Sequence, residues 1–326
     1  MKQAIFEKQH QNSWQAFAKD VQALHKGQIA SGQVKNFSQD YRRMCQHLAI
    51  AQQRGYSQPL LEYLELLVLQ GHQQFYRHKS PLLSQFLAFI VIDFPATVRQ
   101  QWLSIAIAGA LFLGSFMLMA LLTALFPELI HSLLSPAQLA KMENMYDPAQ
   151  RQIGPMSLRN HQDDWAMFGF YIMNNIGIAF QTFASGLILG LGSVFFLLFN
   201  GLHIGAIAGH LTQLGYSATF WPFVIGHGAF ELTAIVIAGA AGLKLGLALI
   251  APGPLSRATA LRRAARTSIK LMGGVIIFLV LAAFIEAYWS SSSSTSIFTK
   301  VLVGSGLWAL MLSYLVFSGR GRYAPH

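Results

Sequence analysis

From Trp165 to Gln213 the chain reads WAMFGFYIMNNIGIAFQTFASGLILGLGSVFFLLFNGLHIGAIAGHLTQ, and from Leu214 to Ile250 it continues LGYSATFWPFVIGHGAFELTAIVIAGAAGLKLGLALI. Only two side chains in this stretch are formally charged, Glu231 and Lys244. The stretch is too long and apolar to be the core of a soluble domain, because about 20 apolar residues already cross the hydrocarbon layer as a helix. It therefore predicts several membrane-spanning helices.

The composition of the whole chain agrees with this prediction. Hydrophobic residues make up 53% of the 326 residues and charged residues 11%, against roughly 25% charged in soluble domains. Polar breaks at Asn174-Asn175, Asn200-Gly201 and residues 213–217 divide the stretch into three segments, of which the first is short or broken. Three further apolar runs lie near Trp102–Phe126, Ile269–Tyr288 and Thr299–Phe317. The predicted fold class is an all-α, polytopic helical membrane bundle with about six spans.

Residues 1–80 precede the first span, and their pattern of apolar side chains predicts a cytoplasmic helical domain. Apolar side chains recur there at helical spacing, which is typical of helices that share a core: Trp14, Phe17, Val21, Leu24, Tyr41, Met44, Leu48, Leu60, Leu61, Leu64, Leu67 and Val68. Residues 81–100 predict an interfacial helix and linker, with an apolar part, Leu82–Ile92, too short to span. The bundle then occupies residues 101–320, with an outer loop at about 127–164.

The outer loop contains one helix signal. Ser135 is a favourable cap and Pro136 suits the first helical turn, so we expect a helix over residues 137–146.

The charge distribution predicts the orientation. Residues 1–101 and residues 251–270, which we expect to form a loop, are rich in Lys and Arg, and Arg320 and Arg322 follow the last span, whereas acids outnumber bases between residues 127 and 164. The positive-inside rule then places both termini in the cytoplasm of a multi-pass protein of the bacterial inner membrane. The net charge of +10 is explained by this topology and by attraction to anionic membrane lipid. We therefore expect no nucleic-acid partner.

The central candidate site is the pair His227 and Glu231. Their i, i+4 spacing places imidazole and carboxylate on one face of a helix, and a carboxylate inside a membrane needs an internal partner. Asn174, Asn175 and Asn200 are the expected partners from neighbouring helices, and His203 and His210 are weaker additions. The pair has three interpretations that the residues leave open: a structural cluster, a proton or solute relay, and a catalytic or metal-binding site.

No residue pattern of an enzyme accompanies the pair. The chain has neither a His-Glu-x-x-His element nor a nucleophile elbow, and its single cysteine, Cys45, excludes a disulfide or a cysteine-based metal site within the chain. We therefore expect no catalytic residue, no cofactor and no metal. Lys244 and Glu286 lie near predicted helix ends, from which we expect them to reach the membrane interface.

The order of several motifs resembles a known family. Asn174-Asn175, Asn200-Gly201 with Gly205, Gly226-His227-Gly228 with Glu231, and the glycine-rich run of residues 238–253 resemble the stage II sporulation protein M family of integral membrane proteins. The resemblance covers residues 165–265. It implies assembly or envelope work and supplies no catalytic activity to carry over to this chain, and longer members look like companions of MoxR-type ATPases and other membrane proteins.

The leading functional prediction is a non-enzymatic inner-membrane scaffold or assembly factor for cell-envelope processes, whose helical domain recruits partners. The alternatives are a proton-coupled transporter or channel that uses Glu231 and His227, and an intramembrane metal-dependent hydrolase. A homodimer is a further expectation, because two-fold dimers are the commonest oligomers; the glycine faces favour close helix association within one chain and between chains alike.

Overall fold

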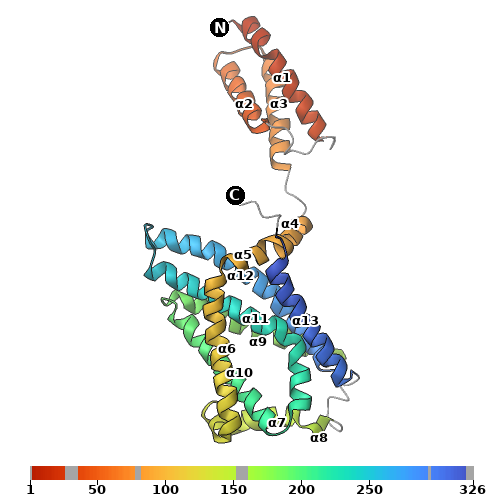
Figure 1. The fold of residues 1–326 in the computed structure, drawn as a ribbon. Helices are drawn as coiled ribbons and strands as arrows, with labels where there is room; N and C mark the ends of the chain where they lie inside the picture. Colours follow the sequence, from red (N-terminus) through yellow and green to blue (C-terminus); the bar gives the residue numbers. More distant parts are fainter. Residues whose placement is uncertain (1, 26–35, 78–81, 152–160, 293–294, 321–326) are drawn as a thin grey trace. The chain divides into compact units, whose positions relative to one another are not determined.

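A computed structural model describes residues 2–25, 36–77, 82–151, 161–292 and 295–320. The chain forms two compact units, Met1–Phe86 and Leu87–His326, which Figure 1 shows as ribbons. All regular structure in the described residues is helical, with no strand. The predicted all-α fold class with a polytopic helical bundle is therefore confirmed.

Up to residue 77, the described residues of the first unit form three helices, α1 (Gln3–His25), α2 (Phe37–Gln53) and α3 (Gln58–Arg77). They surround one hydrophobic core, to which α1 contributes Phe6 as well as the apolar residues at helical spacing. The apolar positions expected from the sequence are confirmed as members of this core or as side chains packed against it.

The second unit begins with a bent helical segment. It comprises the end of α4 (Leu82–Ala88), a π-helical turn η2 (Phe89–Asp93) and α5 (Phe94–Gln100). The predicted apolar part ends at Ile92, but the helix continues beyond it through Pro95, which lies in the first turn of α5. Pro95 has no N–H to donate to the preceding turn, and the carbonyl of Ile90 in that turn accepts from a side chain instead. The Tyr314 hydroxyl donates to the Ile90 carbonyl over 2.6 Å and Arg99 donates to the Leu315 carbonyl over 2.9 Å, which ties the segment to α13.

In the described part of the second unit, six long helices form the bundle. They are α6 (Trp102–Leu125), α9 (His161–Ala184), α10 (Leu191–Gln213), α11 (Ser217–Ile250), α12 (Arg257–Phe284) and α13 (Ile297–Phe317). The central helix is α11, which packs against all five others. A 3-10 turn η5 (Ser185–Leu187) joins α9 to α10, and a second π-helical turn η6 (Ile285–Ser290) extends α12.

Two details of the predicted spans differ in the structure. The basic segment 251–270 is largely not a loop, because α12 already begins at Arg257 and its N-cap Ser256 accepts a hydrogen bond from the Thr259 backbone. The segment that includes α9, predicted to be short or broken, is one continuous helix of 24 residues.

Among the described residues, six helical segments are long and apolar enough to cross a membrane. They include Leu82–Gln100, which we had expected to be interfacial, and they do not include α9. The π-helical turn accounts for the first difference, since it joins two short helices into one segment of span length. Asn174, Asn175 and Gln181 lower the apolar character of α9 and account for the second.

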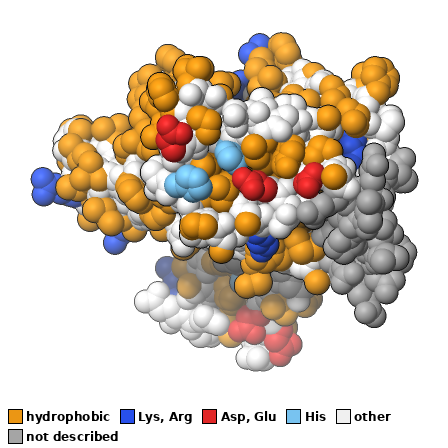
Figure 2. Space-filling model, turned by 90° about the horizontal axis from the view of Figure 1, so that it is seen from below, with side chains coloured by type: hydrophobic (Ala, Val, Ile, Leu, Met, Phe, Trp, Pro, Cys, Tyr) orange, Lys and Arg blue, Asp and Glu red, His pale blue; other side chains and the backbone are white. Residues whose placement is uncertain are grey.

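At one end of the bundle, the connection between α6 and α9 contains η3 (Pro127–Ser132), α7 (Pro136–Tyr146) and α8 (Pro148–Arg151). The predicted helix after Ser135 is confirmed as α7, and it begins with a full capping box between Ser135 and Gln138. We call this end the α7 end. Figure 2 views the molecule from this side: acidic and histidine side chains gather near the middle of a largely hydrophobic face, while Lys and Arg lie mainly toward its rim.

Glycines allow the helices of the bundle to approach backbone to backbone. A Cβ atom on Gly205 of α10 would lie 2.3 Å from the Phe116 carbonyl oxygen of α6, and one on Gly242 of α11 would lie 2.7 Å from the Phe183 carbonyl oxygen of α9. These are contacts with main-chain atoms, which cannot rotate away. The helix pairs α6–α10 and α9–α11 are therefore interlocked at short distance.

This packing predicts that Gly205→Ala lowers the stability of the bundle. The added methyl group must displace α6, and overpacking of this kind costs about 1–3 kcal/mol. Thermal unfolding of the detergent-solubilised protein measures the effect as a lower melting temperature. Gly114→Ala on α6 is the matched control, because a Cβ there meets no atom within 4 Å. Equal melting temperatures for the two variants would contradict the interlocked packing.

Candidate functional site

Three titratable side chains meet inside the bundle. His227 and Glu231 on α11 and Glu286 on η6 each offer a nitrogen or oxygen atom, and these atoms all lie within 4.8 Å of one another. His227 is 6% exposed, and the two carboxylates are partly buried. We call these three residues the His-Glu-Glu cluster.

The cluster is placed by α11 and by the π-helical turn of α12. His227 and Glu231 are four residues apart and share a helical face. Glu286 reaches them from η6, and Gly226 makes room for this turn, since a Cβ on Gly226 would lie only 3.3 Å from Ile285 Cγ2. π-helical turns such as η6, which interrupt the regular hydrogen bonding of an α-helix, occur frequently at functional sites.

Hydrogen bonds hold the turn against α11. Nδ1 of His227 and Oγ of Ser290 form a hydrogen bond of 3.2 Å. Lys300 of α13 is 5% exposed and donates from Nζ to the carbonyl oxygens of Ser290, over 2.8 Å, and of Ser292, over 2.7 Å. The imidazole is therefore oriented by Ser290, which is itself fixed by Lys300.

Of the expected asparagine partners, Asn175 lies at the cluster. Asn175 is 4% exposed and its side chain interacts with the Glu231 carboxylate, although its Nδ2 atom forms no hydrogen bond of normal geometry in the described structure. Its Oδ1 atom accepts a hydrogen bond of 2.9 Å from Nδ2 of the exposed Asn174. α9 thus adds one buried amide to the site.

The remaining predicted residues engage other partners. Asn200 donates from Nδ2 to the Phe196 carbonyl of its own helix over 2.7 Å. His203 stacks on Phe199 with ring centroids 6.0 Å apart. His210 lies 2.8 Å from Glu143 of α7, measured from Nε2 to Oε1, and so ties the α7 segment to α10.

Glu286 is a site residue that we did not expect from the sequence. We expected both Glu286 and Lys244 to reach the membrane interface from helix ends. Lys244 donates from Nζ to Oε1 of Gln101, between α5 and α6, over 2.7 Å. Glu286 instead turns inward, and its Oε2 atom is buried without a hydrogen-bond partner among the described residues. The sequence did contain an indication of this position. Glu286 is a carboxylate in an apolar segment, and such a side chain is expected to face the bundle interior.

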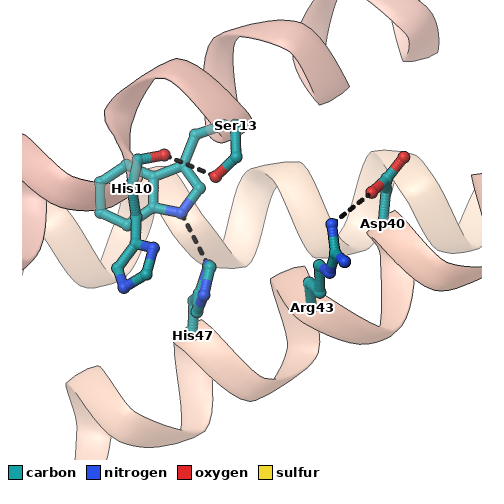
Figure 3. Close-up of polar contacts among 6 residues, drawn as sticks. His10, Ser13, Asp40, Arg43 and His47 are labelled. Atoms are coloured by element: carbon teal, nitrogen blue, oxygen red, sulfur yellow. Dashed lines mark hydrogen bonds and ion pairs between the residues drawn. The ribbon is translucent and has the colours of Figure 1, made fainter.

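The first unit contains a separate polar cluster, shown in Figure 3. Nε1 of Trp14 donates a hydrogen bond of 3.0 Å to Nδ1 of His47, and the His47 ring lies against His10 with centroids 4.1 Å apart. Burial lowers the pKa of His47 below its ordinary value of 6.5, and nearby His10 and Arg43 lower this pKa further. His47 is therefore held as a neutral acceptor for Trp14.

Helix composition and the buried polar groups define the class: this is a multi-pass helical membrane protein. Residues 102–291 match the family model of stage II sporulation protein M. This match covers more than half of the chain, so the chain belongs to the stage II sporulation protein M family. The predicted family is thereby confirmed.

Two further similarities extend the comparison. Residues 4–77 match the model of a domain of unknown function, DUF8413. The uncharacterized protein MJ0793 of Methanocaldococcus jannaschii is 27% identical over 139 residues, which are 40% of this chain and 75% of that protein. No solved structure matches significantly.

The His47 contacts predict that the first unit loses stability in mild acid. Above pH 6.5 His47 is neutral in both folded and unfolded chains. Below pH 6.5 the unfolded chain binds a proton more readily than the folded one, so the free energy of unfolding falls until the pH passes the lowered pKa. Urea unfolding of residues 1–86 between pH 7.5 and 5 measures this slope. His47→Gln is expected to flatten it, and Lys8→Gln is the control; an unchanged slope in His47→Gln would exclude His47 as its source.

Proposed function

We propose that this protein is a non-enzymatic scaffold or assembly factor of the bacterial inner membrane, with the bundle as a rigid anchor and the three-helix unit as a recruitment module. The interlocked contacts at Gly205 and Gly242 support the anchor. Carriers that alternate access rock one part of the bundle against another, and main-chain contacts at this distance oppose such sliding.

The observation that carries the proposal is an exposed apolar stripe on α3. Tyr63, Leu66 and Leu69 are 39%, 51% and 55% exposed and recur every three residues. Leu60, Leu64 and Leu67 supply the buried face of the same helix. Leu66 and Leu69 therefore lie outside the core, while Tyr63 lies at its edge, with its ring centroid 6.2 Å from that of Trp14. A hollow of about 290 Å³ between α1 and α3 also adjoins Tyr63 and is lined in part by Trp14, Leu60 and Glu7.

The charges beside the stripe favour a protein partner over the lipid surface. Glu62 and Glu65 are exposed next to the apolar residues. An anionic membrane leaflet would repel these carboxylates, whereas an amphipathic helix with a basic flank would complement them. The proposed occupant is such a helix from another protein of the envelope assembly, and a MoxR-type ATPase is a candidate on family grounds.

The distribution of basic residues supports the proposed orientation. Lys244 pairs with Gln101 beside α5, and the first turns of α12 carry Arg257, Arg262 and Arg263. Acidic residues of the connection between α6 and α9 lie at the α7 end. By the positive-inside rule the α7 end faces outward and the two termini face the cytoplasm.

The recruitment role predicts that Leu66→Asp releases the partner. An added charge in an apolar contact leaves a carboxylate desolvated, which weakens binding strongly. The full-length variant in native membranes should migrate as a smaller complex in native electrophoresis than the wild type, with the melting temperature unchanged. Gln46→Asp on the exposed part of α2 is the control. Complexes of the same size for wild type and Leu66→Asp would refute this role for α3.

Cation passage through the bundle is the second candidate function, and the His-Glu-Glu cluster favours it. Two carboxylates and an imidazole inside a membrane mark ion pathways in many transporters. Flux of monovalent and divalent cations into proteoliposomes distinguishes this candidate from the scaffold, because a scaffold gives no flux above empty vesicles.

A further inference from the structure

We propose that the His-Glu-Glu cluster is a binding site for one divalent transition-metal ion, with His227, Glu231 and Glu286 as ligands. Their donor atoms lie within 4.8 Å of one another. Ligands of a zinc ion lie about 2.0–2.2 Å from the metal and hence up to about 4 Å from each other. Side-chain shifts of less than about 1 Å therefore bring all three donors to coordination distance.

Charge is the first argument for a metal. Glu231 and Glu286 interact as neighbouring carboxylates, and within the described residues neither forms an ion pair with Lys or Arg. Lys300 directs hydrogen bonds to the carbonyls of Ser290 and Ser292 instead. Two carboxylates that share a desolvated site are stabilised either by a proton or by a positive charge, and one divalent ion makes the site neutral overall.

Unused hydrogen-bonding capacity is the second, independent argument. Asn175 is 4% exposed, and its Nδ2 atom has no normal hydrogen bond although it faces Glu231. Oε2 of Glu286 is also buried without a partner in the described structure. Exchanging the amide oxygen and nitrogen of both Asn174 and Asn175 would keep the bond between them and turn an oxygen toward Glu231. The site thus offers a further oxygen donor from α9.

The surroundings orient the ligands as metal sites require. Ring nitrogens that do not bind the metal usually hydrogen-bond to a neighbouring group, which fixes the imidazole. Nδ1 of His227 is engaged in this way by Ser290, so we assign Nε2 as the metal-binding nitrogen. Lys300 holds Ser290 in place, so α11, η6 and α13 together pre-organise the site.

The donor set selects the class of ion. One imidazole and two carboxylates suit zinc, manganese or iron in the divalent state, whereas calcium prefers oxygen donors alone and copper(I) prefers sulfur. Zinc is therefore the probe of choice. This inference is independent of partner recruitment by α3, because its ligands lie in a different unit of the chain.

Metal binding by the tag-free, full-length protein in detergent tests the proposal. After chelation and dialysis, the wild type should rebind about one zinc ion per chain, measured by elemental analysis, and its melting temperature should rise with added zinc. Glu286→Gln should bind zinc at least tenfold more weakly. The matched control is Glu143→Gln, which makes the same change in the separate pair with His210 and should bind zinc like the wild type.

Failure of the wild type to bind zinc or manganese, or equal binding by Glu286→Gln and Glu143→Gln, overturns the proposal. If Glu286→Gln does not fold, the proposal is tested on the wild type by adding cobalt(II) and recording its visible absorption spectrum. Cobalt(II) bound by imidazole and carboxylates gives visible absorption bands distinct from those of the aqueous ion, and a spectrum identical to the aqueous ion overturns the proposal. Cys45→Ser should leave these bands unchanged, because Cys45 lies in the first unit.

Discussion

Two carboxylates, Glu231 and Glu286, share the interior of one membrane bundle, and hydrocarbon supplies neither with a partner. The surrounding structure is arranged around this constraint. α11 runs through the centre of the bundle, where Glu231 is reached by neighbours on several sides. The π-helical turn η6 brings Glu286 to His227 and Glu231, and Ser290 and Lys300 fix that turn.

The glycines make this central position possible. Gly242 lets α11 approach the carbonyl oxygens at the end of α9, and Gly226 lets η6 approach α11. The same close contacts bring the polar groups together, and they involve main-chain atoms that cannot rotate out of the way. The anchor proposed for this protein and the polar site would thus depend on one packing arrangement, while the three-helix unit has its own separate core.

Much of the architecture could be predicted from local patterns. The core positions of the first unit, the cap of α7 at Ser135 and the all-helical bundle follow from periodicity, capping and hydropathy, which depend on residues close in sequence. The proximity of His227 and Glu231 likewise follows from helical spacing. The helical start of α12 at Arg257 was missed because a run of arginines has no hydropathy signal, although Ser256 supplies a cap.

The sequence by itself therefore determined the class of fold, the family and the helix that carries the buried histidine and carboxylate. The tertiary structure decided which side chains complete the site: Glu286 and Ser290 lie more than 50 residues beyond Glu231 in the chain, and Asn200 turns back to its own helix. Spacing along one helix predicts contacts within that helix only. Contacts between helices depend on how each helix is rotated and where its regular hydrogen bonding is interrupted. Here the π-helical turn η6 interrupts the hydrogen bonding after α12 and places Glu286 beside α11.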